Sequence, residues 1–386
     1  MRDVADIVVI GGGVIGSSIA FHLAAKGAKD VVLLERESIC SGETQKAGGF
    51  VQTHWDTLAE VRLIARSREM FASWKDIVGG DCGFVRGGYL HVTGTDREPD
   101  VRRVHDMLIA DGLESQWIER DDLVSIQPLL DLDRLIGGAW EPSSGWCDSI
   151  ATTRSLAAAA KDRGVDIREG VTVTKIEHAG GRITGVSTTR GTIPCRVVIL
   201  AAGPHVLSLH ATPEVTLPIE IMRGQVAWMN RPNGLPEREI AFYDEVTGVY
   251  THPSGEWNLL GCDRHHPFSL VENPDDYKRD IDSKWLVKAA MAMGYRFPAL
   301  REVAIQRGVT GLYDFTPDGQ PILDGPIGGL EGYYLACGFS GVGFKSAPAT
   351  GLGLAELVLD GKATSVDIAH LQYARFATVA AAVSPS

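Results

Sequence analysis

The sequence has few cysteines and no long apolar run. Its six cysteines stand far apart and form no CxxC pair, so neither a cysteine zinc site nor a disulfide framework is expected. No apolar run reaches the roughly eighteen residues of a membrane-spanning helix, and the opening MRDVADIVVI lacks the pattern of a signal peptide. These absences predict a soluble cytoplasmic protein with free thiols, no metal site and no membrane partner.

Positive charge is also scarce. The 37 lysines and arginines are outnumbered by 49 aspartates and glutamates, which gives a formal net charge of −12. This balance opposes attraction to nucleic acid, and no basic block reverses it locally. Because 386 residues exceed the usual size of one hydrophobic core, two domains are expected.

The strongest motif lies in residues 5–36. An apolar run, Ile7–Ile10, enters the sequence GGGVIG, an amphipathic segment follows to Lys26, and a second apolar run, Val31–Leu34, ends at Glu35. An apolar run, a glycine turn, a helical segment and a second apolar run predict a βαβ unit.

Each conspicuous residue of this unit has a physical task in dinucleotide binding. Gly11 permits the tight turn, Gly13 lets the backbone approach a pyrophosphate, and Gly16 lets the helix lie against the sheet. The pyrophosphate binds the free N–H groups of the helix N-terminus, and Glu35 accepts hydrogen bonds from a ribose. A dinucleotide-binding domain is therefore predicted.

Three further segments are rich in small residues. They are the loop ESICSGETQKAGG at 37–49, the strand RVVILAAG at 196–203 and the glycine loop GFSGVGF at 338–344, which opens a helix at about 345–359. Small side chains leave room for a ligand at the carboxyl edge of a parallel sheet. We expect all three segments to face the cofactor.

The middle of the chain has a different texture. Short β-like stretches alternate with helical segments at 100–110 and 276–293, which suggests an antiparallel sheet. We predict an α/β fold, α+β overall, with a discontinuous Rossmann-like domain and a second, antiparallel-sheet substrate domain. The predicted ranges are 1–80, 148–217 and 308–376 for the first domain, 81–147 and 218–307 for the second, and 377–386 for a disordered tail.

Six stretches carry a family resemblance, and they occur in the family's order over nearly the whole chain. They are ADIVVIGGGVIGSSIAFHLA with VVLLER, SGETQKAGG, VVILAAG, MRGQ at 222–225, GLYDFTPDGQPILDG at 311–325 and GFSGVGFKSAPATG at 338–351. Together they resemble the FAD-dependent D-amino acid oxidase superfamily. The resemblance is greatest to the branch with sarcosine oxidases, especially the β subunit of the multimeric type, dimethylglycine and sarcosine dehydrogenases, glycine oxidase and the proline dehydrogenase β subunit.

The resemblance implies FAD as the resident cofactor and a set of residues that bind it. The implied contacts are Gly11, Gly13, Val14, Ile15, Gly16, Glu35, Arg36, Ser41, Thr44, Lys46, Ala47, Gly48, Gly49, Val173, Ala202, Gly203, Gly311, Gly338, Ser340, Gly341, Val342, Gly343, Phe344 and Lys345. Two departures concern covalent attachment: Lys46 stands where some relatives have a tethering histidine, and Gly311 stands where others have a tethering cysteine. Non-covalent FAD is therefore expected.

On the substrate side, Lys345 matches a lysine that binds carboxylate in sarcosine oxidases, whereas Val51 replaces an arginine with that task in several members. The lysine that promotes reaction with oxygen corresponds to about Leu259, which favours a dehydrogenase over an oxidase. Tyr250 and His252 are two residues apart on an expected strand, so their side chains share one face. Together with Lys345, they are the candidate catalytic residues. Each of them also has an ordinary structural explanation.

Three more polar residues are candidate substrate contacts. Gln52 and His54, next to Trp55, follow the loop at 37–49 that is expected to line the flavin, and they could form the mouth of the site. Arg223, with Gln225, could hold substrate or brace the junction between the domains. For a lone histidine, a hydrogen-bonded structural role is the more frequent outcome.

The leading hypothesis is oxidation of the C–N bond of a secondary or tertiary amine or N-substituted amino acid. Hydride transfer to flavin N5 would give an imine that water hydrolyses, and oxygen or another acceptor would take the electrons. One alternative is oxidation of a 2-hydroxy acid, with His252 or His54 as the base. The other is a flavin subunit of a hetero-oligomeric amino acid dehydrogenase.

Overall fold

The computed structural model describes residues 4–212, 214–232, 240–262 and 268–376, and two large sheets organise them. The first sheet has six strands in the order β19-β20-β12-β1-β2-β8, and all neighbours are parallel except the edge pair β19 and β20. Its strands are β1 (Ile7–Ile10), β2 (Val31–Leu34), β8 (Asp166–Arg168), β12 (Val197–Leu200), β19 (Ile322–Asp324) and β20 (Tyr333–Cys337). This mostly parallel order confirms the predicted α/β, Rossmann-like domain.

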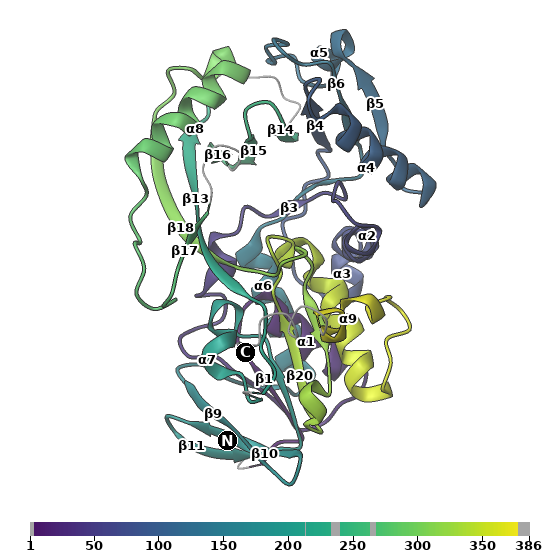
Figure 1. Ribbon diagram of the computed structural model, residues 1–386, viewed down its shortest axis with the longest axis vertical. Helices are drawn as coiled ribbons and strands as arrows, with labels where there is room; N and C mark the ends of the chain where they lie inside the picture. The colour runs from purple at the N-terminus through teal and green to yellow at the C-terminus, as the bar shows by residue number, and fades with distance from the viewer. Residues whose placement is uncertain (1–3, 213, 233–239, 263–267, 377–386) are drawn as a thin grey trace, which may run out of the picture.

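The parallel sheet is covered on both faces (Figure 1). Ile7 and Val9 point to a helical layer, while Val8 and Ile10 point to a small antiparallel sheet, because alternate side chains leave opposite faces of a strand. The helices are α1 (Val14–Ala25), α2 (Leu58–Ala72), α3 (Trp74–Ile77), α6 (Ser149–Asp162) and α9 (Gly343–Asp360). The small sheet consists of β9 (Val173–Ala179), β10 (Arg182–Thr188) and β11 (Gly191–Pro194).

The second large sheet has nine strands in the order β17-β13-β16-β15-β14-β4-β6-β5, with β18 also paired to β13. These strands are β4 (Tyr89–Thr93), β5 (Gln116–Glu119), β6 (Gly137–Glu141), β13 (Glu220–Asn230), β14 (Ala241–Asp244), β15 (Val249–Ser254), β16 (Trp257–Cys262), β17 (Ser269–Leu270) and β18 (Ile305–Phe315). Pairing is antiparallel throughout except between β4 and β14. The predicted antiparallel sheet is present, with this one parallel pair added.

The two faces of the nine-stranded sheet differ in character. Leu90, Val92 and Phe242 pack in an apolar core with the buried side of α8 (Ser283–Arg296). The alternate residues Tyr89 and His91, from the same strand as Leu90 and Val92, point away from this core. The polar face therefore turns toward the six-stranded sheet, and the space between the two sheets forms the candidate site.

The chain crosses between the two sheets several times, as the colours of Figure 1 show. The short strands β3 (Phe50–Val51) and β7 (Gly145–Trp146) pair with each other at one crossing. Strand β18 pairs with β13 from Ile305 to Phe315, so the predicted boundary at 308 falls inside a strand of the large sheet. The predicted tail, 377–386, lies outside the described residues.

The helix expected at 276–293 is α8, which begins later, at Ser283. The preceding residues form a loop whose Lys278 and Asp280 carbonyl oxygens accept hydrogen bonds from Arg223. The helix expected at 100–110 is α4 (Glu98–Ala110), and the remaining short helices are α5 (Leu123–Ile126) and α7 (Val206–Leu209). Among the described residues, no helix is both long and apolar enough to cross a membrane.

Strand β6 was not expected, because its sequence, GGAWE, begins with two glycines, which disfavour strands. The close contact between β6 and β4 at Gly138 explains why a glycine stands in this strand. A Cβ there would lie 2.6 Å from the His91 carbonyl oxygen of the neighbouring strand β4. Only glycine therefore permits this close approach of β6 to β4.

A fully buried ion pair fastens α8 to the large sheet. Arg296 Nε donates to Asp244 Oδ2 at 2.8 Å, and both side chains are 0% exposed. Arg296 also donates to the carbonyl oxygens of Asp131 and Asp133, while Asp244 accepts from Thr247. The pair thus joins three segments of the second domain at one point.

We expect the Asp244→Ala substitution to lower the free energy of unfolding by about 3–5 kcal/mol, because it leaves the Arg296 charge buried without its carboxylate. Urea denaturation followed by circular dichroism measures this loss. The matched control is Glu69→Ala, which removes a carboxylate from the solvent-exposed pair with Arg66 and should change the unfolding curve little. Equal curves for both variants would contradict the structural role of the pair.

Candidate active site

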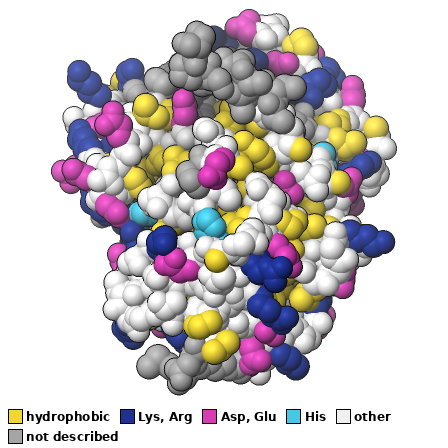
Figure 2. All heavy atoms as spheres, turned by 60° about the horizontal axis from the view of Figure 1, so that its bottom comes forward, with side chains coloured by type: hydrophobic (Ala, Val, Ile, Leu, Met, Phe, Trp, Pro, Cys, Tyr) yellow, Lys and Arg dark blue, Asp and Glu magenta, His cyan; other side chains and the backbone are white. Residues whose placement is uncertain are grey.

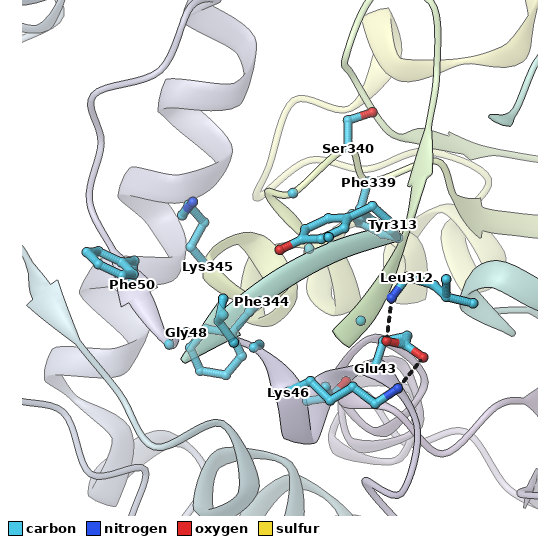
Figure 3. A pocket seen from close by; sticks show the side chains of 18 of the residues that line it. Glu43, Lys46, Gly48, Phe50, Leu312, Tyr313, Phe339, Ser340, Phe344 and Lys345 are labelled. Carbon is cyan, nitrogen blue, oxygen red and sulfur yellow. Dashed lines mark hydrogen bonds and ion pairs between the residues drawn. The ribbon is translucent and has the colours of Figure 1, made fainter. Parts of the chain in front are cut away.

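A cavity of about 470 Å³ lies between the two large sheets. One side is formed by the N-terminus of α1, the segment 339–345 and residues 43–49, which we call the flavin loop after the family resemblance. The other side is formed by β13, β18 and the polar face of the nine-stranded sheet, including Tyr89, Tyr243 and Tyr250. Figure 3 shows Lys345, Phe344 and Tyr313 around this space, with Lys46 and Glu43 at its lower side.

The glycine turn after β1 is so tight that only glycine fits at two positions. Gly11 has φ +111°, and a Cβ there would lie 2.3 Å from the Ala201 carbonyl oxygen. A Cβ on Gly16 would lie 1.9 Å from the Gly11 carbonyl oxygen.

The first turn of α1 contains no acidic residue, and its N-cap, Gly13, supplies no side-chain hydrogen bond. A helix N-terminus with this positive end at a cavity suits an anionic pyrophosphate.

Two side chains fix the geometry of the glycine turn. Glu35 Oε2 accepts a hydrogen bond from Gly12 N at 2.7 Å, and Thr44 Oγ1 accepts one from Val14 N at 3.1 Å. Arg36 lies at the surface, where its Nη1 donates to Asp275 Oδ1 at 2.8 Å. Glu35 and Thr44 therefore shape the dinucleotide loop itself, besides any contact they make with a ligand.

The flavin loop is tied to β18 through Glu43. Its Oε2 accepts from Leu312 N at 2.7 Å, and its Oε1 accepts from Lys46 Nζ at 2.8 Å, as the dashed lines in Figure 3 show. Lys46 Nζ also donates to the Tyr277 hydroxyl at 3.1 Å. The resulting network holds the loop against the cavity from both domains. Ala47, Gly48, Gly49 and Gly311 line the cavity beside it.

The segment before α9 bends sharply into the cavity. Gly338, Ser340 and Gly341 have φ values of +70°, +49° and +98°, and Gly338 N donates to the buried Asp314 carboxylate at 2.6 Å. Ser340, Gly341, Gly343 and Phe344 line the cavity, and the first turn of α9 contains no acidic residue. Its backbone N–H groups are placed for a negative group, as the sequence predicts.

Lys345 is a buried cation of the cavity wall, which also includes Lys46, and it lies in the first turn of α9. It is 6% exposed, and its Nζ lies 4.4 Å from the centre of the Trp55 ring. Burial lowers the pKa of Lys345 to about 8, although Glu60 and Glu141 partly counteract the shift. A buried ammonium at a helix N-terminus is costly, so an anion bound beside it would be stabilised.

The structure separates the other predicted substrate residues into two groups. Gln52 and Tyr250 line the cavity, and the Tyr250 ring lies over Gly261, where a Cβ would be 1.8 Å away. His54, His252 and Arg223 are buried outside the cavity lining. Val173, Ala202, Gly338 and Val342 also lie outside the lining, whereas Gly203 is part of it.

His252 and Arg223 brace the structure. His252 Nε2 lies 2.5 Å from the Gly48 carbonyl oxygen, its Nδ1 lies 2.7 Å from the Pro253 carbonyl oxygen, and Trp146 stacks on its ring. Arg223 uses its guanidinium on the 278–282 loop, including Asp282 Oδ2 at 2.9 Å. These contacts of Arg223 brace a loop within its own domain, 218–307, rather than the junction between the domains.

Tyr89 and Tyr243 line the cavity, although the sequence motifs do not single them out. Tyr89 and Tyr243 lie on strands β4 and β14, which are far apart in the chain and parallel in the sheet. The alternation of YLHVT could have identified a two-faced strand, but not which face meets the cavity. Leu259, the expected counterpart of the lysine that promotes reaction with oxygen, lies next to the flavin loop, since a Cβ at Gly48 would be 3.4 Å from its Cδ1.

These features define a dinucleotide-dependent enzyme in which a parallel sheet presents its cofactor to a second sheet domain. The sequence pattern of the FAD dependent oxidoreductase family, DAO, matches residues 6–357, and the chain therefore belongs to this family. Its cofactor is FAD, and the glycine turn, the N-terminus of α1 and Glu35 fit the dinucleotide. Among the described residues, no group of three or more histidine, cysteine, aspartate or glutamate side chains is placed to hold a metal ion.

Individual relatives agree with this assignment. Mitochondrial sarcosine dehydrogenase of Homo sapiens is 28% identical over 368 residues, which are 93% of this chain and 40% of that protein. The 4-methylaminobutanoate oxidase (formaldehyde-forming) of Paenarthrobacter nicotinovorans is 30% identical over 363 residues, 92% of this chain and 43% of that protein. The chain thus spans about two fifths of these relatives.

A solved structure matches over its whole length. The crystal structure of L-proline dehydrogenase from P. horikoshii superposes with a TM-score of 0.89 at 27% identity, covering 98% of this chain and 99% of that one. The fold of this chain is therefore that of a solved protein of similar size.

We expect Gly16→Ala to abolish retention of FAD, because the added methyl group would meet the Gly11 carbonyl oxygen and open the turn. The measurement is flavin absorbance per protein chain after purification. Gly42→Ala is the matched control: Gly42 has φ −81°, and nothing lies within 4 Å of its Cβ position. Full flavin content in Gly16→Ala, or equal loss in both variants, would contradict the assigned role.

Proposed function

We propose that this chain oxidises an N-substituted amino acid, a secondary or tertiary amine that carries a carboxylate. The observation that supports this proposal is Lys345, a buried ammonium in the cavity wall at the N-terminus of α9. Sarcosine and 4-methylaminobutanoate, which appear in the names of two relatives, are both N-methylated amino acids. FAD, when bound, supplies the acceptor for a hydride.

The residues of the chain would bind and orient the substrate. Lys345 would hold its carboxylate, while the rings of Trp55, Tyr89, Tyr243 and Tyr250 would surround the apolar N-substituent and exclude water. The proposed catalytic set is therefore Lys345 and Tyr250, with His252 supporting the flavin loop through Gly48.

We also propose that FAD is held without a covalent bond. Lys46 is engaged by Glu43 and Tyr277, and the backbone of Gly311 lies at the cavity where some relatives have a cysteine. Cys337, the cysteine nearest the flavin motifs, is 0% exposed in β20. Acid precipitation should release all of the flavin into the supernatant.

The 2-hydroxy acid alternative needs a base at the carbinol proton. Both histidines suggested for this role lie outside the cavity lining, and both ring nitrogens of His252 are near carbonyl oxygens. Burial also lowers the pKa of His54 well below its ordinary value. The geometry therefore favours the amine over the hydroxy acid.

The deciding experiment is anaerobic mixing of the purified yellow protein with candidate substrates. The panel holds sarcosine, dimethylglycine, glycine, proline, iminodiacetate, D-amino acids and 2-hydroxyglutarate, and loss of flavin absorbance reports reduction. We expect N-alkyl amino acids to bleach the flavin. Bleaching by the hydroxy acid alone would overturn the proposal. Slow return of colour in air would indicate that another acceptor, or a partner subunit, takes the electrons.

We expect Lys345→Met to weaken binding of carboxylate-bearing amines about 10- to 100-fold, because it removes a buried charged partner. The pKa of Lys345 is lowered to about 8, so its ammonium is present below that pH and is lost as pH rises through it. Substrate affinity of the unmodified protein should therefore fall above about pH 8. Anaerobic flavin titrations measure both effects.

An amine of similar size without a carboxylate is the control ligand for this prediction. Its affinity should be the same for Lys345→Met and the unmodified protein. Equal losses for both ligands would instead show that Lys345 only supports the shape of the cavity.

A further inference from the structure

A continuous chain of hydrogen-bonding groups runs from the cavity wall toward the surface. The Tyr89 hydroxyl lies 3.0 Å from His91 Nδ1, and His91 Nε2 lies 3.0 Å from Glu245 Oε1. Tyr89 lines the cavity, whereas the Glu245 side chain is 15% exposed and has Arg97, itself 47% exposed, at 3.7 Å from its Oε2. These three side chains connect the cavity wall to a partly exposed carboxylate through two hydrogen bonds.

The sheet geometry creates this alignment. Tyr89 and His91 are two residues apart on β4, so both point from the same face. The parallel partner β14 places Tyr243 opposite His91, and Glu245 follows two residues later, with its N donating to the Val92 carbonyl oxygen. Residues 154 positions apart in the chain are thereby brought into hydrogen-bond contact.

Each of the three groups can accept a proton at one atom and release one. A phenol oxygen is donor and acceptor, imidazole has two ring nitrogens, and a carboxylate accepts. This chemistry matters because an amino acid's amine is an ammonium near neutral pH, and its nitrogen must lose a proton before its carbon can give up a hydride. With substrate bound, the aromatic side chains of the cavity wall would exclude the water that could otherwise remove that proton.

We propose that Tyr89, His91 and Glu245 form a proton path that carries the proton of the bound substrate ammonium out of the cavity. This inference rests on the proposed function. The ammonium N–H bond breaks as an O–H bond forms on Tyr89, whose original proton moves to His91 Nδ1. The His91 Nε2–H bond then breaks as Glu245 Oε1 gains the proton, and Glu245 releases it to water. No electrons change hands.

The surroundings of His91 hold its ring in place. The His54 ring lies 4.2 Å and the Tyr243 ring 4.7 Å from the His91 ring, measured between centroids. Burial lowers the pKa of His54 well below its ordinary value, so the ring that packs beside His91 is neutral.

The charged groups around the path differ in how closely they approach His91. Glu245 contacts His91 directly, and Glu141 on β6 reaches it only through His54, whose Nδ1 is 4.0 Å from Glu141 Oε1. Arg97 lies beyond Glu245, and the buried Arg68 lies near Thr53 and Ser144, which both donate to Glu141. A carboxylate is therefore the nearest charge on the outward side of His91.

Three substitutions interrupt the path and keep most of the packing: Tyr89→Phe, His91→Gln and Glu245→Gln. We expect each to slow anaerobic flavin reduction by a carboxylate-bearing amine at about pH 7 by roughly 100-fold or more. The rates should approach that of the unmodified protein at alkaline pH, where the amine enters without its proton. Retained flavin per chain shows that each variant has folded.

His105→Gln is the matched control. His105 is a buried histidine on α4 that hydrogen-bonds Ser115 at 2.7 Å and lies outside the cavity lining. Its pH profile should equal that of the unmodified protein. Rates of the path variants that equal the unmodified protein at every pH, or that are lowered by one factor at every pH, would overturn the proton path alone.

Failure of the proposed function gives a different result. If no amine bleaches the unmodified protein, both the amine activity and the path for its proton are wrong. Nitrogen-15 spectra of histidine-labelled protein supply a readout independent of turnover. The ring signals of His91 should shift in Tyr89→Phe and in Glu245→Gln, and unchanged signals would show that the hydrogen-bonded chain does not form in solution.

Discussion

The close approach of three backbone segments at the first glycine turn is the constraint on which the remaining structure depends. Gly11 lies against Ala201, and Gly16 lies against Gly11, with no room for a Cβ at either glycine. This crowding joins β1, β12 and α1 and points the N-terminus of α1 into the cavity. A side chain at either position would separate these elements and remove the anion site together with the packing.

The second sheet domain completes the site by having two unlike faces. One face packs against α8 in an apolar core that the buried pair of Arg296 and Asp244 closes. The other face supplies Tyr89, Tyr243 and Tyr250 to the cavity. Figure 2 shows Lys and Arg side chains interspersed with Asp and Glu on one face of the molecule. Lys345, in contrast, is buried in the cavity wall.

Some predicted site residues reach the cavity and others do not, for a common physical reason. Alternation correctly grouped Tyr250 with His252 on one face of β15, yet Tyr250 lines the cavity while His252 lies deeper against Gly48. Alternation tells which face of a strand a side chain leaves, but it does not tell whether that side chain reaches the cavity. Arg223 likewise points to a loop that the sequence had predicted as helix.

The sequence by itself determined the βαβ unit, the cofactor class and the glycine loops, because each depends on residues close together in the chain whose backbone needs are local. The discontinuous plan also followed from the order of these motifs. Only the tertiary structure brought Tyr89 and His91 on β4 to Glu245 after β14, and Lys345 over Trp55. Such contacts join residues separated by long stretches of chain, and their geometry is set by sheet register and helix packing, which no local pattern specifies.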